Sequence, residues 1–260
     1  MDDKAFQEGD YVLVADSKDR TKIHRLEAGK KIESHAGIAE MDAIIGLYPG
    51  SILVTSKGQK LHVSKPTMEE HILNMKRGAQ IIYPKDFGVN VSMGDIFPGA
   101  KGLESGVGSG SLSLALLQAV GESGSITGFE IREDFAEVAR KNIDDFSPYA
   151  KNYEIVINDI YEKIEIQGAK YDRIVLDLPE PQRVLPHLKG ALVNGGIITS
   201  YVPTVLQAHK FCIELDDAGH DQRQTKEIME RGWYFSKTSA RPDHRMVAHT
   251  GFITSAKIFY

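Results

Sequence analysis

The chain of 260 residues is long enough for one large and one small domain, and its 42% hydrophobic and 26% charged content is ordinary for a globular protein. A net charge of −5 gives no support for nucleic-acid binding by bulk electrostatics, so any RNA would have to bind a local positive surface. The single cysteine, Cys212, excludes an intramolecular disulfide, argues against a cysteine metal site and indicates a reducing compartment.

The first residues, "MDDKAFQEGD", are acidic and polar, unlike a secretory signal, and no apolar run approaches the ~18 residues of a membrane span. We therefore expect a cytoplasmic protein with no membrane attachment. Residues 1–65 are expected to form a small antiparallel β-domain, because short alternating segments are separated by turns that contain glycine. These segments are 10–16, 22–34 and 50–63.

A second, larger domain is expected over residues 66–260. It begins with a helix after Thr67, since Thr67 and Glu70 have the spacing of a capping box. Strands and helices then alternate with short loops, which predicts a doubly wound parallel α/β sheet of the Rossmann type. The expected strands are 101–106, 124–130, 153–159, 171–177 and 195–202, and the expected helices are 110–121, 132–146, 179–192 and 203–219. The last apolar segments, 232–240 and 251–260, are expected to pair with each other as an antiparallel edge.

The first strand of this sheet leads into a glycine-rich turn, "LESGVGSGSLS". Gly106, Gly108 and Gly110 permit a tight turn and a close approach of the backbone to a ligand. The N–H groups of Ser109 and Ser111 then open a helix, where a negative group is favoured. Because ligands of open α/β sheets bind beyond the carboxyl ends of the strands, the turn is a candidate binding site. A tight strand–helix connection without a ligand is the alternative.

Acidic residues end the next two expected strands. Glu130 could accept both hydroxyls of a ribose, and Asp159 could accept from the adenine N6 amine. The alternative for Glu130 is a solvated residue at a helix N-terminus, and the alternative for Asp159 is an Asx turn or helix cap. Ligand-facing groups at three successive strand ends favour a nucleotide, either NAD(P) or S-adenosylmethionine.

The turn reads E-x-G-x-G-S-G from Glu104, which resembles the first motif of class I S-adenosylmethionine-dependent methyltransferases. That family also ends its sheet with one reversed strand. The resemblance implies cofactor contacts from the turn, the strand ends and their neighbours. We assign these contacts to Ile82, Glu104, Gly106, Gly108, Ser109, Gly110, Ser111, Glu130, Asp159, Ile160 and Asp177.

A narrower resemblance covers nearly the whole chain. "RGAQIIYPKD", "LDLPEP" and "RPDHRMVAHTGFI" together are similar to the tRNA (adenine-N1)-methyltransferase family of the TrmI type. The resemblance implies methyl transfer to the T-loop adenosine at position 58 of tRNA, in some members also at position 57, by a homotetramer. The family often has a basic or imidazole side chain where this chain has Phe135, which puts any cofactor contact from that position in doubt.

Asp177 is the expected catalytic residue. In the usual strand order the fourth strand lies beside the first, so Asp177 would lie next to the glycine turn. The "D-L-P-E" segment is similar to the Asp-Pro-Pro-aromatic motif of methyltransferases that act on base amines. There an oxygen acceptor holds the exocyclic amine while a nitrogen attacks the methyl group. Capping of the following helix is the alternative role for Asp177.

Methylation at N1 requires the base to leave its stack, so aromatic walls are needed. Tyr83 and Tyr201 are assigned to this role and to the catalytic set, although each could be a core tyrosine. RNA phosphates are assigned to a local cluster, Arg241, His244, Arg245 and His249, with a core position as the alternative for His249. No His and carboxylate spacing indicates a metal site.

Three rival functions differ from this interpretation. A methyltransferase of protein carboxyls or small molecules would share the glycine turn and Glu130, but it would not need the "YPKD" and "RPDHRMVAHTGFI" segments. A non-catalytic tRNA-binding subunit would be expected to have lost the turn or Asp177. An NAD(P) oxidoreductase is disfavoured by the sequence of the turn.

Overall fold

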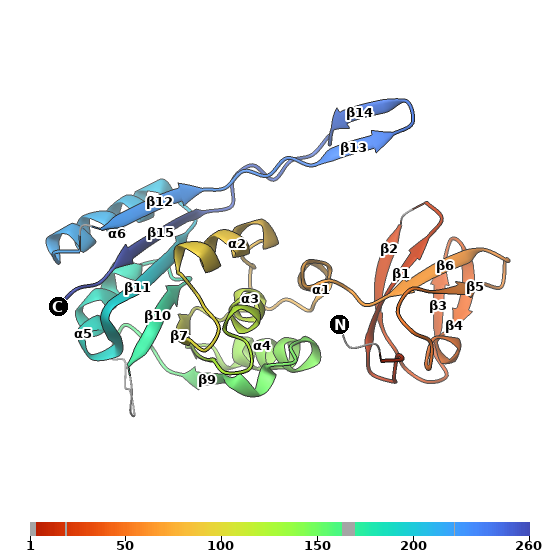
Figure 1. The fold of residues 1–260 in the computed structure, drawn as a ribbon, viewed down its shortest axis with the longest axis horizontal. Helices are drawn as coiled ribbons and strands as arrows, with labels where there is room; N and C mark the ends of the chain where they lie inside the picture. The colour runs from red at the N-terminus through yellow and green to blue at the C-terminus, as the bar shows by residue number, and fades with distance from the viewer. Residues whose placement is uncertain (1–3, 19, 163–169, 221) are drawn as a thin grey trace. The chain divides into compact units, whose positions relative to one another are not determined.

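The chain forms two compact units, Met1–Met75 and Lys76–Tyr260 (Figure 1). The computed structural model describes residues 4–18, 20–162, 170–220 and 222–260. Across these residues, none of the helices has the length and apolar composition to cross a membrane.

The N-terminal unit is an antiparallel β-structure, as predicted. Its four-stranded sheet has the order β2-β1-β6-β5, and a second hairpin pairs β3 with β4. The core contains Phe6, Val12, Leu26, Ile44 and Leu61. The strands are β1 Tyr11–Asp16, β2 Thr21–Arg25, β3 Lys31–Ser34, β4 Gly37–Glu40, β5 Ser51–Val54 and β6 Lys60–Ser64, with a 3₁₀ turn, η1, at Met41–Ala43.

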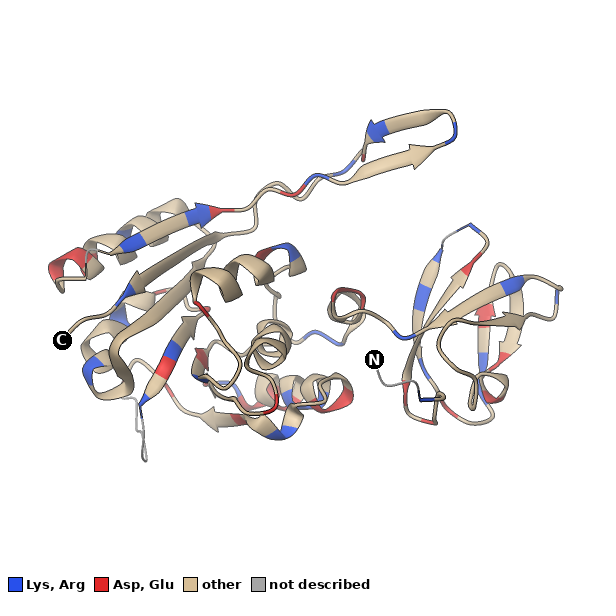
Figure 2. Ribbon diagram, in the orientation of Figure 1, with Lys and Arg blue, Asp and Glu red and all other residues tan. Residues whose placement is uncertain are grey.

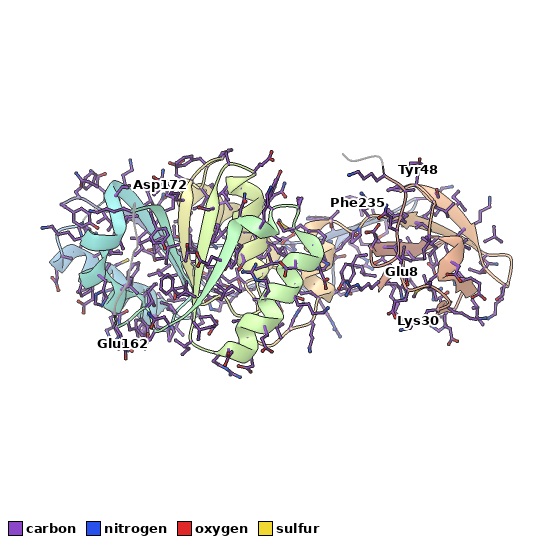
Figure 3. All side chains as sticks on the ribbon, turned by 90° about the horizontal axis from the view of Figure 1, so that it is seen from below. Glu8, Lys30, Tyr48, Glu162, Asp172 and Phe235 are labelled. Atoms are coloured by element: carbon purple, nitrogen blue, oxygen red, sulfur yellow. The ribbon has the colours of Figure 1, made fainter. Side chains whose placement is uncertain are left out.

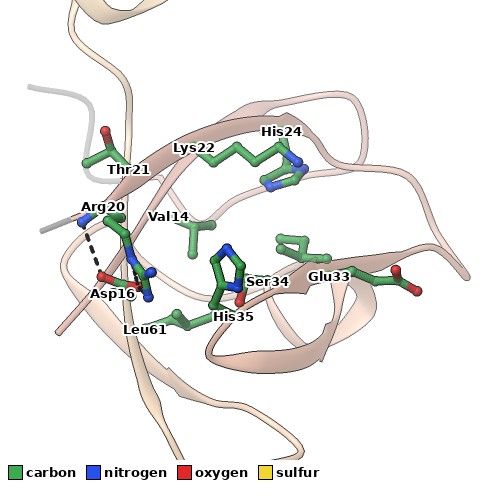
Figure 4. Close-up of a pocket in the computed structure, with 11 residues that line it drawn as sticks. Val14, Asp16, Arg20, Thr21, Lys22, His24, Glu33, Ser34, His35 and Leu61 are labelled. Carbon is green, nitrogen blue, oxygen red and sulfur yellow. Dashed lines mark hydrogen bonds and ion pairs between the residues drawn. The ribbon is translucent and has the colours of Figure 1, made fainter. Parts of the chain in front are cut away.

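A cavity of about 480 Å³ lies within this unit (Figure 4). Apolar side chains of Val14, Ile32 and Leu61 line it beside the imidazoles of His24 and His35. Its lining residues come from the N-terminal unit alone, so it shares none with the strand ends that the sequence assigns to the cofactor.

Helix α1, Met68–Asn74, begins with the predicted capping box. The Thr67 hydroxyl accepts a hydrogen bond from the Glu70 N–H at 3.2 Å, and the Glu70 carboxylate accepts one from the Thr67 N–H at 2.8 Å. The ring of His71 meets that of Tyr11 edge-on with 5.0 Å between centroids. Because α1 packs on the N-terminal sheet, the compact units divide after Met75, whereas the sequence pattern placed the boundary near residue 65.

The second unit is a seven-stranded sheet of order β12-β15-β11-β10-β7-β8-β9. The last five of these pair in parallel, and β15 is antiparallel to β11, which confirms the Rossmann-type methyltransferase sheet with a reversed final strand. The strands are β7 Lys101–Ser105, β8 Ser125–Glu130, β9 Tyr153–Ile157, β10 Tyr171–Leu176, β11 Leu192–Val202, β12 Arg223–Glu227 and β15 Phe252–Lys257.

Helices pack on this sheet through the apolar faces that their sequences predict. Helix α3 is buried along almost its whole length, while α4 buries one face and α6 buries Ala208, Phe211 and Leu215. Contacts join α3 to β8, α4 to β9 and α6 to β15. The helices are α2 Pro84–Met93, α3 Ser111–Val120, α4 Glu133–Phe146 and α6 Val205–Asp217, with a 3₁₀ turn, η2, at Ala150–Asn152.

The helix predicted over 179–192 is wrong for most of its length. The segment forms a 3₁₀ helix, η3 Pro181–His187, and only one α-helical turn, α5 Leu188–Ala191. Pro186 lies inside it, lacks an N–H to donate and would clash with the carbonyl four residues earlier in an α-helix. The apolar spacing was compatible with a helix, but the proline was not.

The predicted edge pair is also wrong. Strand β15 pairs with β12, and the predicted partner segment instead forms a separate hairpin of β13 Trp233–Ser236 and β14 Ser239–Pro242. The sequence of β12, "RQTKE", lacks the apolar alternation that marks a half-buried strand, and every residue of β12 is exposed. It joins the sheet through main-chain bonds.

Candidate active site

The strand order brings the carboxyl ends of β7, β10 and β11 together. Leu176 of β10 pairs with Ser105 of β7 on one side and with Ser200 of β11 on the other. The next residues along these strands are Gly106, Asp177 and Tyr201, and the Asp177 N–H donates to the Ser105 carbonyl at 2.8 Å. The predicted adjacency of Asp177 and the glycine turn is therefore confirmed.

The glycine turn depends on left-handed backbone. Gly106, Gly108 and Gly110 have φ of 86°, 56° and 81°. A Cβ on Gly106 would overlap the carbonyl oxygen of Asp177, so this glycine is required by the contact between the two strand ends. At Gly108 the nearest atom to such a Cβ is 3.5 Å away on Ala79, an ordinary contact. Glycine at position 108 is therefore favoured by its left-handed φ and not by a close packing contact.

Glu130 lies against this turn. Its carboxylate accepts hydrogen bonds from the N–H groups of Gly108 and Arg132, both at 3.0 Å, and the residue is 7% exposed. It is not the solvated residue of the alternative interpretation. The negative charge of Glu130 also raises the pKa of the neighbouring Asp177 carboxyl.

Asp177 is half-buried and its carboxylate receives no hydrogen bond from the described part of the chain. The following 3₁₀ helix has Glu180 as its N-cap and no side-chain capping bond, so helix capping is not its role here. Burial, and secondly the Glu130 charge, raises the pKa of Asp177 to about 7. The site thus contains a carboxyl with spare acceptor capacity that titrates near neutral pH.

Glu104 is buried beneath the turn. One oxygen accepts from the hydroxyls of Ser113 at 2.7 Å and Tyr153 at 2.5 Å. The other oxygen, Oε1, has no partner among the residues that the structure describes. Burial raises the pKa of Glu104 to about 7, and the charges of Asp177 and Glu130 act in the same direction.

Replacing Glu104 by glutamine should stabilise the protein in alkaline solution. The pKa of Glu104 is about 7 in the folded protein and 4.5 in the unfolded chain. Between these pH values the folded state holds the proton more tightly, so the free energy of unfolding decreases as the pH rises. Glutamine keeps the acceptor for Ser113 and Tyr153 but cannot ionise. The gain in unfolding free energy should reach about 3 kcal/mol above pH ~8 and vanish near pH ~4.

Thermal melts of Glu104→Gln and the wild type across this pH range measure the effect. Glu214→Gln, on the exposed face of α6, is the control and should show no such pH-dependent difference. A stability difference that does not change with pH would contradict a titrating Glu104.

Three other predicted cofactor residues already have partners or are buried. Asp159 accepts the Tyr161 N–H at 2.8 Å, so the alternative Asx turn is present and one of its oxygens is engaged. Ile82 and Ile160 are each 2% exposed, with Ile160 in the core beside Leu176. The side chains of both isoleucines are therefore held in the protein interior.

The two predicted aromatic residues differ in exposure. Tyr83 is the N-cap residue of α2 and is partly exposed. Tyr201 is 7% exposed, and its hydroxyl donates to Asp86 at 3.4 Å. Burial, with the Asp86 and Asp177 charges also contributing, raises the pKa of Tyr201 above its usual range. Tyr201 is therefore anchored in the structure and lies near Asp177.

Sequence reasoning missed the buried ion pair of Lys85 and Asp86. Their side chains are 5% and 0% exposed, with 2.8 Å between Lys85 Nζ and Asp86 Oδ1. The signal was available, because two charged residues stand inside the apolar "IIYPKDFGV".

The predicted phosphate-binding residues are divided between two places. The Arg241 guanidinium, on β14, lies 4.8 Å from the centre of the Tyr234 ring, and His244 and Arg245 are exposed after it. His249 instead bonds Glu227 Oε1 and the Pro203 carbonyl, each at 2.7 Å. It is an exposed residue rather than a core histidine, and neither ring nitrogen is left for a phosphate.

Phe135 is the position at which the sequence departs from the expected pattern. Its ring lies against the guanidinium of Arg132. The Arg132 guanidinium carbon lies 3.7 Å from the centre of its ring. A positive group is therefore present here, although it is carried by another residue.

Comparison with known proteins gives one consistent result. A family model described as "tRNA methyltransferase complex GCD14 subunit" matches residues 59–240, and one described as "TrmI-like N-terminal" matches residues 5–53. The TrmI tRNA (adenine(58)-N(1))-methyltransferase of Thermus thermophilus is 31% identical, covering 95% of this chain and 96% of its own. The TrmI tRNA (adenine(57)-N(1)/adenine(58)-N(1))-methyltransferase of Methanocaldococcus jannaschii is 32% identical, covering 95% of each chain.

A solved structure also matches over nearly its full length. It is described as a SAM-dependent O-methyltransferase from Thermotoga maritima, with a TM-score of 0.91 and 31% identity over 98% of this chain and 95% of that one. Both units of the present chain thus have counterparts in that structure.

Proposed function

Since the chain belongs to the tRNA (adenine-N1)-methyltransferase family of the TrmI type, we propose that it methylates N1 of the T-loop adenosine 58 in tRNA, with S-adenosylmethionine as methyl donor. Adenosine 57 is a second target for the same site. The observation that carries the proposal is the acceptor carboxylate of Asp177 at the strand end next to the glycine turn. A non-catalytic tRNA-binding subunit would not need to keep both.

The residues around the turn fit the cofactor. The Glu130 carboxylate is held against the turn by the Gly108 N–H, where its remaining lone pairs can accept ribose hydroxyls. The unpartnered oxygen of Glu104 offers a buried acceptor under the turn. When bound, S-adenosylmethionine supplies an electrophilic methyl group on a sulfonium. Asp159 and the main chain of Ile82 and Ile160 complete the proposed site.

Asp177 orients the adenine and takes up its proton. The ring nitrogen N1 already carries a lone pair, so the enzyme has to position it more than activate it. Asp177 accepts a hydrogen bond from the exocyclic N6 amine, which becomes acidic once N1 is methylated. A carboxylate with a pKa of about 7 is matched to accept that proton near neutral pH.

The base has to leave its stack to reach this site. Tyr83, partly exposed at the start of α2, and Tyr201, anchored beside Asp177, are the proposed walls for it. Arg241, His244 and Arg245 are the proposed phosphate contacts, whereas His249 is assigned a structural role. We also propose a cytoplasmic location, because the tRNA substrate is found there.

Mass spectrometry of nucleosides from unmodified tRNA, incubated with the protein and isotopically labelled S-adenosylmethionine, tests the function. We expect labelled N1-methyladenosine. Label on a ribose oxygen would instead support the O-methyltransferase description of the Thermotoga maritima structure. Absence of label from tRNA would refute the proposed reaction.

Glu130→Ala should weaken S-adenosylmethionine binding by ~1.5–3 kcal/mol, because a charge-assisted bond to the ribose is lost. Calorimetric titration measures the affinity, and a melting curve confirms that the variant is folded. Glu133→Ala, an exposed residue at the start of α4, is the control and should bind normally. Unchanged affinity of a folded Glu130→Ala protein would remove Glu130 from the cofactor site.

We further propose that the chain assembles as a homotetramer through the β13–β14 hairpin. Trp233 and Phe235 are 54% and 71% exposed and stack with 6.4 Å between ring centroids. Strand β13 carries no charged residue (Figure 2), and the Phe235 side chain is labelled in Figure 3. An apolar surface of this kind on a two-stranded hairpin is typical of a protein contact.

Replacing Trp233 and Phe235 by alanine should therefore yield a smaller species in light scattering at matched concentration. Tyr48→Ala is the control, because Tyr48 is 54% exposed, as Trp233 is, and lies in the N-terminal unit. An unchanged mass for the hairpin variant would place the assembly contact elsewhere.

A further inference from the structure

The buried pair of Lys85 and Asp86 connects segments that lie far apart in the chain. Lys85 Nζ donates to the Ile228 carbonyl at 2.6 Å as well as pairing with Asp86. On the other side of the pair, Asp86 Oδ2 accepts from the Thr250 hydroxyl at 2.8 Å. The start of α2 is thereby tied to both chain segments that connect the β13–β14 hairpin with the sheet.

A fully buried carboxylate persists only when its charge is matched and its oxygens are bonded. Asp86 meets both conditions, because Lys85 occupies Oδ1 and Thr250 occupies Oδ2. The methyl transfer described above uses neither residue of the pair. The remaining role for the pair is therefore to hold other residues in place.

Tyr201 is the third donor to this carboxylate. Its hydroxyl bonds the same Oδ2 at 3.4 Å, across 115 positions of the chain. The ring is also confined on the side of Gly251, where a Cβ would lie 2.5 Å from Tyr201 Cζ. With its hydroxyl held by Asp86 and its ring packed on Gly251, Tyr201 has little freedom to rotate.

We propose that Asp86, held in place by Lys85 and Thr250, is a positioning residue that fixes the Tyr201 ring beside Asp177. The inference rests on the proposed function, in which Tyr201 forms one wall for the target adenine. It accounts for two sequence segments that the chemistry alone leaves unexplained. "YPKD" supplies the acceptor, and "HTG" supplies a second donor and the glycine against which the ring packs.

The test removes the anchor without leaving a buried charge unpaired. Lys85→Met/Asp86→Leu deletes both charges together, and Tyr201→Phe keeps the ring but deletes its hydroxyl. Each should lower kcat about tenfold, corresponding to about 1.4 kcal/mol, with little change in S-adenosylmethionine affinity. Because both changes break the same bond, the triple variant should be no slower than Lys85→Met/Asp86→Leu. If the triple variant were slower by the product of the two separate losses, the proposal would be overturned.

A conservative series guards against misfolding of the charge-pair variant. Thr250→Val should slow methyl transfer and Thr250→Ser should restore it, since serine retains the donor to Asp86. Thr254→Val is the matched control. Thr254 lies on β15, four residues after Thr250, but its hydroxyl bonds that of Thr225 at 2.9 Å instead of Asp86. Equal rates for Thr250→Val and Thr254→Val would overturn the role of the Asp86 network.

A spectroscopic measurement separates this inference from the proposed reaction. With 3-fluorotyrosine at position 201, the ¹⁹F resonance should shift and narrow in Thr250→Val and in Lys85→Met/Asp86→Leu, as the ring gains mobility, and stay unchanged in Thr254→Val. This result does not require methyl transfer. An unchanged resonance in the anchor variants would overturn the proposal even if tRNA is methylated.

Discussion

Asp177→Ala should lower the single-turnover rate of tRNA methylation, measured at saturating S-adenosylmethionine, on the order of 10²-fold, while tRNA affinity stays close to wild type. The alanine removes the one acceptor that orients the adenine N6 amine, so N1 is no longer held in line with the methyl group. The loss should therefore appear in kcat rather than in binding. The carboxylate has no other hydrogen-bond donor in the described structure that its removal would leave unpaired.

Asp177→Asn separates orientation from proton transfer. The amide retains an acceptor for N6 but cannot take its proton, so it should be faster than alanine if orientation dominates. The pH dependence adds a second readout. With a pKa of about 7, the wild-type rate should fall as pH drops below neutrality and the carboxylate is protonated, whereas the asparagine rate should not follow that titration.

Melting curves of the two variants provide the control. If Asp177 only capped a helix, both variants would methylate normally and alanine would cost ~1 kcal/mol of stability. A normal rate with lowered stability would remove Asp177 from the catalytic set.

Gly106→Ala should be the most damaging single substitution in the glycine turn. Its φ of 86° strains an L residue, and the added methyl would overlap the main-chain carbonyl of Asp177, which cannot rotate away as a side chain could. Either the strand ends separate or the turn opens. We expect a loss of several kcal/mol in stability, on the order of the largest core substitutions, together with loss of detectable S-adenosylmethionine binding.

Gly121→Ala is the matched control for this substitution. Gly121 also has a left-handed φ, of 65°, but a Cβ there would meet no atom within 4 Å. It should lose only the ~1–2 kcal/mol of backbone strain and bind the cofactor normally. Equal melting temperatures for the two variants would show that contact with Asp177 does not constrain Gly106.

Local sequence was sufficient for the features that depend on neighbouring residues. The capping box at Thr67, the left-handed turn from Gly106 to Gly110 and the buried face of α4 each follow from residues within a few positions of one another. The sheet order then followed from the rules of doubly wound folds, which placed Asp177 beside the turn. Most of the proposed site was therefore accessible from sequence.

Features that depend on distant partners were decided only by the tertiary structure. Strand β12 has no apolar pattern and is a strand because β15 offers it main-chain partners. His249 could be a phosphate ligand from its sequence, until Glu227 and Pro203 occupy both its nitrogens. Asp86 meets Thr250 across 164 positions of the chain. Periodicity and spacing report a residue's local conformation and burial, but a polar side chain takes its role from the groups that folding brings to it.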